Sequence, residues 1–415
     1  MAKKPNIRFA GFEDDWEQRK LGEIADKVSE KNKNNEFSEP FTNSAEQGII
    51  SQKDYFDREI VNNENLDSYY IVRNDDFIYN PRISVTAPVG PINRNRLGRN
   101  GVMSPLYTVF RTHDIDNPYL EFYFKTTKWH RFMKLNGDSG ARFDRFTISS
   151  TQFMEMPIPY PMLDEQRKIG EYFDSLDNLI TLHQRKCDEL KKVKKFMLQK
   201  MFPKKGEKNP EIRFDGFTND WEQRKLLEFG LATGGTSIES EFSEDGVYKV
   251  ISIGSYSEDS VYRDQGIRAV RSDKTVNRIL NKGDITMILN DKTASGNIIG
   301  RVLLIEESGV YVYNQRTERI EVDNSNYDSQ FIYTMLNAPA IRDKIIKQSQ
   351  GNTQIYVNWT TISQTDYLVP QFSEQRKIGE YFANLDHLIT LHQRKCEELK
   401  NVKKYMLQNM FAKGE

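Results

Sequence analysis

Residues 165–202 read EQRKIGEYFDSLDNLITLHQRKCDELKKVKKFMLQKMF, and residues 374–411 read EQRKIGEYFANLDHLITLHQRKCEELKNVKKYMLQNMF. The two stretches are identical at 31 of 38 positions and lie 209 residues apart. A match of this quality does not arise by chance, so the chain contains an internal repeat. The repeat includes a second pair of stretches, residues 7–23 and 212–228, which are identical at 13 of 17 positions.

The segments between these repeats are different from each other. They are 141 and 145 residues long, and each is large enough for one domain. A chain of 415 residues is expected to hold two or three domains. We therefore expect two copies of one unit with similar ends and different middles. The expected boundaries are residues 1–163 and 204–372 for two variable domains, and residues 164–203 and 373–412 for two long helices.

The 38-residue repeat has the pattern of a coiled-coil helix. Its apolar residues recur in alternating steps of four and three. It contains no Pro, and Pro203 ends it, while Asp164 and Ser373 can cap the two helix starts. A helix of 38 residues is about 57 Å long. The residues expected to pair the two helices are Ile169, Phe173, Leu176, Ile180, His183, Cys187, Leu190, Met197, Ile378, Phe382, Leu385, Ile389, His392, Cys396, Leu399 and Met406.

Two helices of nearly one sequence form a self-complementary surface, so we expect them to pack about a pseudo-twofold axis. Antiparallel pairing would place the two variable domains at opposite ends of a rigid spacer. Further apolar residues widen the stripe to a second face of the helix, and these are Leu179, Leu182, Val193 and Leu198.

The variable segments read as mixed helix and sheet. Short runs rich in β-formers are bounded by Gly, Asn, Asp or Pro, at residues 77–79, 106–110, 285–289 and 302–305. Each segment then holds one helical tract, at residues 118–136 and 329–349, and one polar loop, at residues 137–142 and 350–354. We therefore predict an α+β fold, in which two long antiparallel helices separate two β-rich α/β domains.

Composition limits the classes of function. The chain has 59 Lys and Arg against 60 Asp and Glu, which argues against coating DNA by global charge but allows a local basic cleft. Its two cysteines exclude a disulfide framework and fit a reducing compartment. We expect neither a signal peptide nor a membrane-spanning helix, and therefore a cytoplasmic protein.

Motifs of catalysis are missing from the sequence. Methyltransferases that act on amino groups of bases carry an Asn/Asp-Pro-Pro-Tyr/Phe tetrapeptide, and the nearest approaches here are NPR at residues 80–82 and NPY at residues 117–119. No phosphate-binding loop of the type used for ATP hydrolysis is present. No carboxylate cluster with a neighbouring Lys suggests a nuclease metal site. We expect a chain without catalytic residues or a bound cofactor.

One set of residues could hold a metal. His183 and Cys187 lie four residues apart, and His392 and Cys396 repeat them. An antiparallel helix pair could bring the four together, and two His with two Cys suit zinc. The alternative is that a small thiol and an aromatic polar residue simply fill the helix seam. We favour packing and predict no metal site.

The first variable segment carries a run suited to DNA. Residues 77–113 contain five Arg and no Asp or Glu, with Asn and Tyr interleaved. Arg and Asn can form the bidentate hydrogen bonds that distinguish guanine and adenine, each worth about 1–3 kcal/mol. The alternative is a solvated loop that binds phosphates or nothing. The candidate contacts in the first segment are Tyr79, Asn80, Arg82, Ser84, Thr86, Arg94, Arg96, Arg99, Arg142 and Arg145. The weaker candidates in the second are Asn290, Lys292, Thr293, Ser295, Arg301, Gln315, Arg316, Thr353, Gln354 and Tyr356.

Taken together, these features resemble a known family. The order of variable domain, EQRKIGEYF-type helix, second variable domain and the same helix again is similar to the specificity subunit of type I restriction–modification systems. The WEQRKL stretches at residues 16–21 and 221–226 add to the resemblance, as do TGGT at residues 233–236 and YNP at residues 79–81.

The resemblance implies two target-recognition domains, each reading one half of a split double-stranded DNA sequence. It implies two methyltransferase subunits that bind S-adenosylmethionine and modify adenine, and motor-nuclease subunits that use ATP and Mg. It transfers no contact residue, so the candidate contacts rest on residue chemistry alone. Two other functions remain open: a single-chain DNA adenine methyltransferase, and a coiled-coil scaffold that joins two protein-binding domains.

Overall fold

The structure is a computed structural model that describes residues 4–55, 66–139, 144–292, 296–351 and 354–412. The chain forms two compact units. Unit 1 consists of residues 1–184 and 394–415, and unit 2 consists of residues 185–393. Each unit therefore contains one variable domain and one part of each long helix.

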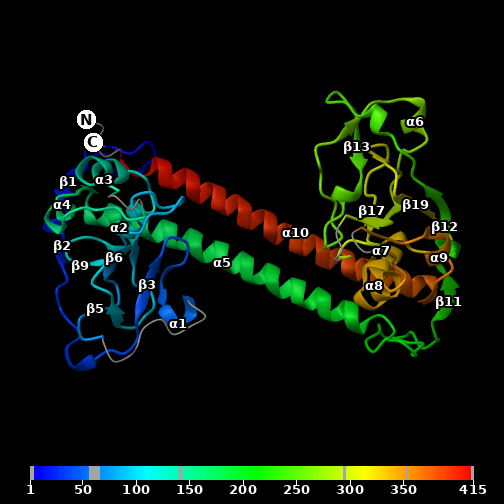
Figure 1. Cartoon of the computed structure of the whole chain (residues 1–415), viewed down its shortest axis with the longest axis horizontal. Helices are drawn as coiled ribbons and strands as arrows, with labels where there is room; N and C mark the ends of the chain where they lie inside the picture. The colour runs from blue at the N-terminus through cyan, green and yellow to red at the C-terminus, as the bar shows by residue number, and fades with distance from the viewer. Residues whose placement is uncertain (1–3, 56–65, 140–143, 293–295, 352–353, 413–415) are drawn as a thin grey trace. The chain divides into compact units, whose positions relative to one another are not determined.

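A four-stranded antiparallel sheet in the order β2-β9-β6-β7 forms the centre of unit 1 (Figure 1). Its strands are short and their apolar side chains are buried, as in β6, where all three residues are buried. The four strands are β2 (Ala25–Lys27), β6 (Phe77–Tyr79), β7 (Ile92–Arg94) and β9 (Thr108–Thr112). The remaining strands pair in twos and are β1 (Glu17–Lys20) with β10 (Pro157–Tyr160), β3 (Phe41–Ser44) with β4 (Gly48–Ser51), and β5 (Tyr70–Val72) with β8 (Gly101–Met103).

The helical tract expected at residues 118–136 is broken in two. Helix α2 (Asn117–Phe124) starts at Asp116, whose carboxylate accepts from the Tyr119 backbone N–H. The chain then turns, and α3 (His130–Asn136) follows. Six of the eight residues of α2 are buried, because the helix lies between the sheet and α5. Two short helices complete the unit, α1 (Gln52–Tyr55) and α4 (Ser150–Met154).

Unit 2 repeats the sheet order of unit 1 as β12-β19-β15-β17. All four residues of β15 are buried, so both faces of this strand are covered. These strands are β12 (Gly230–Gly234), β15 (Ile285–Ile288), β17 (Val302–Leu304) and β19 (Thr317–Val322). The smaller sheets are β11 (Glu222–Lys225) with β21 (Asp366–Val369), β16 (Asn290–Asp291) with β20 (Ile355–Tyr356), and β14 (Arg268–Ala269) with β13 (Tyr248–Ile251) and β18 (Tyr311–Tyr313).

The tract expected at residues 329–349 is also two helices, α7 (Ser329–Asn337) and α8 (Pro339–Ile346). The break lies at Ala338, whose extended backbone (φ −65°, ψ 139°) is the conformation that a following Pro requires. Pro339 then starts α8, where its missing N–H costs nothing. Two further short helices are α6 (Asp273–Val276) and α9 (Trp359–Ile362).

The two repeats form the long helices α5 (Leu163–Lys200) and α10 (Phe372–Asn409). Within unit 1 the first part of α5 lies antiparallel to the last part of α10 (Figure 1), and Lys403 Nζ contacts the Asp177 carboxylate at 2.5 and 2.7 Å. Within unit 2 the other two parts pair in the same way, and Lys194 Nζ contacts Asp386 Oδ1 at 2.5 Å. The two ion pairs are related by the 209-residue offset, so each unit pairs the same positions of the repeat.

The helix seam also forms part of each domain core. Phe173 of α5 lies 5.0 Å from Phe122 of α2 and 6.0 Å from Phe411, measured between ring centroids. In unit 2, Phe382 of α10 lies 6.2 Å from Phe202. The same apolar stripe therefore holds the helix to its domain as well as to the other helix.

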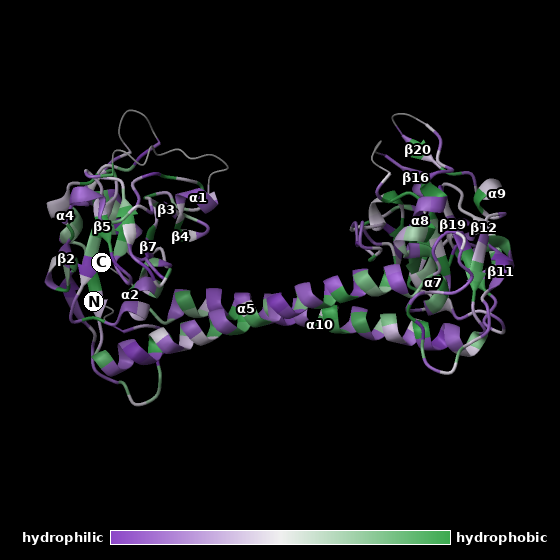
Figure 2. Cartoon of the chain, turned by 90° about the horizontal axis from the view of Figure 1, so that it is seen from below, coloured by the Kyte–Doolittle hydropathy of each residue, from purple (hydrophilic) through white to green (hydrophobic). Residues whose placement is uncertain are grey.

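The expected second apolar face is largely left open. In unit 1, Leu179 and Leu182 are 43% and 62% exposed, and in unit 2 Val193 is 44% exposed. Apolar and polar residues alternate along both helices in Figure 2. The helices thus carry exposed apolar side chains that neither unit covers.

Candidate nucleic-acid interface

In each unit, one central strand ends beside the start of its neighbour, and the loops at this edge of the sheet can be compared between the units. In unit 1, β6 ends where β9 begins, because Tyr79 pairs with Thr108. In unit 2, β15 ends where β19 begins, because Ile288 pairs with Thr317. We call these two places the reading edges, and each brings together several loops of its domain.

The reading edge of unit 1 is built on Asn80. Its side-chain amide donates to Asn43 O at 2.8 Å, and its Oδ1 accepts from the Arg82 backbone N–H at 2.9 Å. The Phe146 N–H donates to Pro81 O at 2.7 Å, and Arg82 and Arg145 form a β-bridge. Asn80 itself is buried and holds the exposed Arg82 in place.

The loop after Arg82 is exposed. The hydroxyls of Ser84 and Thr86 lie 3.1 Å apart at its tip, and both residues are exposed. Val85 between them is fully exposed. An apolar side chain in this position can contact a thymine methyl group. Sequence reasoning passed over Val85 because an apolar residue beside β-formers is ordinarily part of a core.

Other predicted contacts of unit 1 have internal roles. Tyr79 is buried and its hydroxyl donates to Val89 O at 3.0 Å, which leaves the side chain no access to DNA. Burial also raises the pKa of the Tyr79 hydroxyl. Tyr79 is therefore a structural residue.

Three of the predicted arginines lie at the opposite edge of the sheet. Arg94 pairs with Phe77, at the far end of β6, and its guanidinium forms an ion pair with Glu121 at 2.9 Å. Arg96 donates to Glu121 and to Asp174 of α5, each at 2.7 Å. These carboxylates neutralise the arginines and tie β7 to α2 and α5.

Arg99 is also paired with a carboxylate from another segment of the chain. Its guanidinium donates twice to the Glu39 carboxylate, both times at 2.8 Å, and this bidentate pair raises the pKa of Arg99. The absence of acidic residues from 77–113 therefore does not make the region a basic patch, because carboxylates from other segments reach it.

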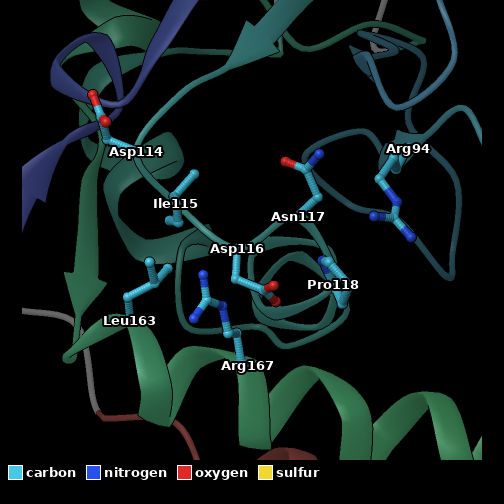
Figure 3. Close-up of a pocket in the computed structure, with 8 residues that line it drawn as sticks. All are labelled: Arg94, Asp114, Ile115, Asp116, Asn117, Pro118, Leu163 and Arg167. Carbon is cyan, nitrogen blue, oxygen red and sulfur yellow. The ribbon is translucent and has the colours of Figure 1, made fainter.

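A hollow of about 430 Å³ lies beside Arg94 where the domain meets α5 (Figure 3). Burial raises the pKa of Asp116 in this hollow, while its hydrogen bond from Tyr119 N and the nearby Arg94 and Arg167 act against that rise. The charged groups of the hollow have partners of their own: Arg94 pairs with Glu121, Arg167 with Asp164 and Asp114 with His113, and Asp116 caps α2. We assign it to the junction between domain and helix. Its lining residues are Arg94, Asp114, Ile115, Asp116, Asn117, Pro118, Leu163 and Arg167.

The reading edge of unit 2 has the same backbone plan. Asn290 and Tyr356 pair between β16 and β20, and the Val357 N–H donates to Leu289 O at 2.9 Å. The Leu289 N–H donates to Arg316 O at 2.9 Å, which brings the turn before β19 to the same place. Arg316 is exposed and has a φ of 66°.

The TGGT turn closes this edge. The Gly235 N–H donates to Thr317 O at 2.8 Å, and a side chain at Gly235 would meet Asn314 O at 2.1 Å. Arg278 donates to Gly234 O at 2.8 Å, so it fixes the turn from outside. Only glycine fits here because the two backbones are in direct contact.

A buried carboxyl lies next to this turn. Glu318 of β19 is 5% exposed and pairs with Gly234 across the sheet. Burial raises its pKa to about 7, and Arg278 acts against the rise. Ala25 pairs with Thr112 as Gly230 pairs with Val322, so Thr108 is the residue of unit 1 that matches Glu318, and only unit 2 has an ionisable group there.

The other predicted residues of unit 2 fall into two groups. Lys292 and Gln354 are exposed beside β16 and β20. Arg301 is half-buried and donates to Asn297 O and Ser260 Oγ, and burial lowers its pKa. Gln315 donates to Glu239 at 3.2 Å. Four predicted contacts lie outside the described residues: Arg142, Thr293, Ser295 and Thr353.

Each unit contains one Cys of the helix seam. Cys396 belongs to unit 1, where its Sγ lies 3.9 Å from Ile180 O, and Cys187 is buried in the apolar core of unit 2. Within the described residues, no group of three or more His, Cys, Asp or Glu side chains could hold a metal ion. Both thiols fill apolar positions.

Sequence reasoning missed the residues that attach each domain to its helix. Glu165 accepts from Arg8 at 2.6 and 2.8 Å and from Trp16 Nε1 at 3.1 Å. Gln166 Oε1 accepts from the Asp116 N–H at 2.9 Å, at the start of α2. The signal was present, because EQRK is repeated in both helices although these polar residues lie off the apolar seam.

Unit 2 has the same attachment. Glu374 accepts from Arg213 at 2.7 and 2.8 Å, and Gln375 accepts from the Asp328 N–H at 3.0 Å. The glycine of the repeat is also explained: a side chain at Gly379 would lie 2.6 Å from Asp328 Oδ1. The identical stretches are therefore the parts that hold helix and domain together.

A family model described as "Type I restriction modification DNA specificity domain" matches residues 13–192 and again residues 218–401. The two matches cover most of the chain. The chain belongs to this family. It contains two copies of the specificity domain, as the internal repeat predicted, and the mixed helix and sheet fold with a long helix between the domains is confirmed.

Members of the specificity family include a relative from Methanocaldococcus jannaschii, the type I restriction enzyme MjaVIII specificity subunit. It is 26% identical over 331 residues, which are 77% of this chain and 75% of that protein. The S subunit of a type I system from M. genitalium has the same fold, with a TM-score of 0.60 and 13% identity over 98% of this chain and 99% of that one. A chain from a structure on the complex assembly and conformational transition of the type I R-M system aligns with a TM-score of 0.50 and 13% identity. The alignment covers 96% of this chain and 98% of that chain.

Neither alternative function is favoured by these relatives, which are specificity subunits of restriction–modification systems. Within the part of the chain that is described, no helix combines the length and the apolar character needed to span a bilayer.

Proposed function

We propose that this chain reads a two-part double-stranded DNA target for a type I restriction–modification complex, with each domain reading one half. The observation that carries the proposal is the pair of reading edges. They share a backbone plan but present different side chains, with Arg82 and Arg145 in one and Asn290 and Tyr356 in the other. A common frame with different surface groups is what two readers of different sequences need.

The long helices set the distance between the two half-sites in this proposal. The Lys403–Asp177 and Lys194–Asp386 pairs support it, because each fixes the register of the antiparallel helices within its unit. Two readers held at a fixed separation require half-sites at a fixed spacing.

The exposed apolar side chains on the helices are the docking surface for two methyltransferase subunits. The support is their repetition: Leu179 and Leu182 in unit 1 correspond to Leu388 and Leu391 in unit 2, and all four are 40–62% exposed. Two similar surfaces fit two copies of one partner. Motor-nuclease subunits complete the complex.

The chain itself carries no catalytic residue and no cofactor in this proposal. S-adenosylmethionine, ATP and Mg act on the partner subunits. The support is the sequence, which has neither the Asn/Asp-Pro-Pro-Tyr/Phe tetrapeptide nor a phosphate-binding loop.

The test is to produce the chain together with its methyltransferase subunits and to map methylated adenines across a genome. We expect a two-part motif with an unread spacer. Exchange of residues 24–164 for the same region of another family member should change one half of the motif and leave the other half and the spacer unchanged. Methylation by the purified chain alone, or a motif that changes in both halves, would contradict the proposal.

A further inference from the structure

The two reading edges can be aligned residue by residue through their backbone hydrogen bonds. The Asn80 N–H donates to Pro91 O at 3.0 Å, and the Ile288 N–H donates to Arg301 O at 3.0 Å. These two bonds occupy the same place in sheets of the same strand order. Asn80 and Ile288 are therefore equivalent positions.

One residue further on, the alignment continues. Bonds from Phe146 N to Pro81 O and from Val357 N to Leu289 O match. The bridges that follow match as well, so that Arg82 is equivalent to Asn290 and Arg145 is equivalent to Tyr356. Each domain thus carries one cross-strand pair at an identical point of its frame.

The side chains of such a pair point to the same face of the bridge and lie close together, because residues directly opposite in an antiparallel pairing have Cβ atoms about 4.5–5.5 Å apart. Arg82 is exposed, and the Arg145 side chain is 41% exposed. Asn290 is partly exposed, and Tyr356 is 42% exposed. Both pairs are open to a ligand outside the sheet edge.

The arginine pair is unfavourable without an anion. Two like charges directly opposite each other destabilise a strand pairing. The described residues offer Arg82 no carboxylate, and the only ion pair of Arg145 is with exposed Asp144 at 3.8 Å. Arg94, Arg96 and Arg99 of the same region are each paired with a carboxylate at 2.7–2.9 Å. Arg82 is therefore kept available for an external acceptor.

The matching pair of unit 2 is neutral and is also held in position. Tyr356 OH donates to Gln350 Oε1 at 3.0 Å, which fixes the ring beside Asn290. Exposed Lys292 follows two residues after Asn290 and supplies the positive charge of this edge. The amide of Asn290 has both a donor and an acceptor to offer.

We propose that Arg82 and Asn290 are the specificity-determining residues at one equivalent base position of each half-site, where Arg82 selects guanine and Asn290 selects adenine. This inference rests on the proposed function. Arginine donates two hydrogen bonds to guanine O6 and N7, whereas asparagine donates to adenine N7 and accepts from its N6 amino group. Arg145, beside Arg82, binds the neighbouring phosphate.

The experiment uses the full chain produced with its methyltransferase subunits, with methylated adenines mapped for wild type, Arg82→Ala, Arg82→Lys and Asn290→Ala. Arg82→Ala should lose the preference for guanine at one position of one half-site by about 5- to 150-fold. Asn290→Ala should relax one adenine of the other half-site by a similar factor. Binding of the complex to duplexes with single base changes should give the same positions.

The matched control is Arg99→Ala, which removes the same charge from the same region at the opposite edge of the sheet. It should leave every motif position unchanged. Thermal unfolding of each variant confirms that its domain is folded, and Arg82→Lys provides a second test that keeps the charge but loses the two-pronged geometry. We expect Arg82→Lys to relax the same base as Arg82→Ala.

The outcomes separate the inference from the proposed function. A two-part motif for wild type that stays unchanged in Arg82→Ala and Asn290→Ala overturns the inference alone. Uniformly weaker binding to all duplexes, with a smaller salt dependence and no relaxed base, shows a phosphate contact and also overturns it. Absence of any two-part motif for wild type overturns both.

Discussion

Unit 1 and unit 2 attach their helices with the same residues and present different residues at their reading edges. The attachment uses Arg8 with Glu165 in unit 1 and Arg213 with Glu374 in unit 2, and the side chains of both glutamates are fully buried. The attachment of helix to domain must keep one geometry in both units, whereas the side chains at the reading edges are free to differ. The near-identity of the repeats and the divergence of the middles follow from this division of roles.

The two attachments differ in two hydrogen bonds. Arg213 Nη1 donates to Asn209 Oδ1 at 3.3 Å, whereas the buried Arg8 Nη1 has no partner among the described residues. Trp16 Nε1 donates to Glu165, but the buried Trp221 Nε1 has no partner among the residues that the structure describes. A buried N–H without a partner costs free energy, and each attachment leaves one such donor. Only Glu165 also accepts a hydrogen bond from its tryptophan. The comparison therefore predicts unequal responses to equivalent substitutions.

The largest effect is expected for the buried glutamates. Glu165→Ala leaves the Arg8 guanidinium and the Trp16 N–H without their acceptor, and should destabilise unit 1 by about 3–5 kcal/mol, the usual cost of breaking a buried ion pair. Glu374→Ala loses no bond from Trp221, so its effect on unit 2 should be smaller. Hydrogen exchange followed by mass spectrometry measures the two units separately in the full chain.

Glu171→Ala is the matched control, since Glu171 is exposed on the same helix. It should change hydrogen exchange in neither unit. A loss of protection in Glu171→Ala as large as in Glu165→Ala, or a larger loss for Glu374→Ala, would show that the attachment does not depend on these bonds.

A smaller effect, confined to unit 2, is expected from pH. The folded state raises the pKa of Glu318 to about 7, above the ordinary value of 4.5, so it binds a proton more tightly than the unfolded chain. Stability should therefore fall as pH rises from about 4.5 to about 7. Glu318→Gln should remove this loss and make unit 2 more stable than wild type at pH 8 but not at pH 4.5.

Thermal unfolding at the two pH values, with hydrogen exchange to assign the transition to unit 2, measures this effect. Unit 1 has Thr108 at the equivalent place and should show no such change in Glu318→Gln. An equal gain at both pH values would mean that the carboxyl is not the titrating group.

The smallest effect is expected for the paired Lys and Asp on the helices. Asp177 and Asp386 are 42% and 35% exposed, so each ion pair is accessible to water and should contribute less than about 1 kcal/mol. Double-mutant cycles with Lys403→Ala and Asp177→Ala, and with the equivalent pair Lys194 and Asp386, should give equal coupling energies. Unequal values would show that the two units do not pair the repeated helices in the same way.

Much of the fold could be predicted because the helix repeat carries its own pattern. The apolar seam, Pro203 and the acidic first turn identify α5, which begins at Leu163 and ends at Lys200. The broken helical tracts could not be predicted from periodicity. Pro339 gave a local signal for one break, whereas the break between α2 and α3 contains neither Pro nor Gly.

The candidate interface was harder to predict, for an electrostatic reason. Composition identified the Arg-rich region, but the partners of Arg96 and Arg99 are Asp174 and Glu39, which lie far away in the sequence. Only the three-dimensional fold shows which arginines are neutralised. Asn80 illustrates a second limit, since the sequence does not distinguish an amide that supports the loop from one that faces a base.

Unit 1 is assembled from both ends of the chain, and this affects its synthesis. Its core includes Phe411, whose ring lies 5.5 Å from Tyr119 and 6.0 Å from Phe173. About 210 residues separate the two segments of the unit, so a ribosome adding roughly 5–20 residues per second needs about 10–40 s between them. Unit 2 itself becomes complete at residue 393, just before the last segment of unit 1 is made. Until Phe411 is made, the rings of Tyr119 and Phe173 in nascent unit 1 lack this contact. Chaperone binding during translation is therefore most relevant to the first domain.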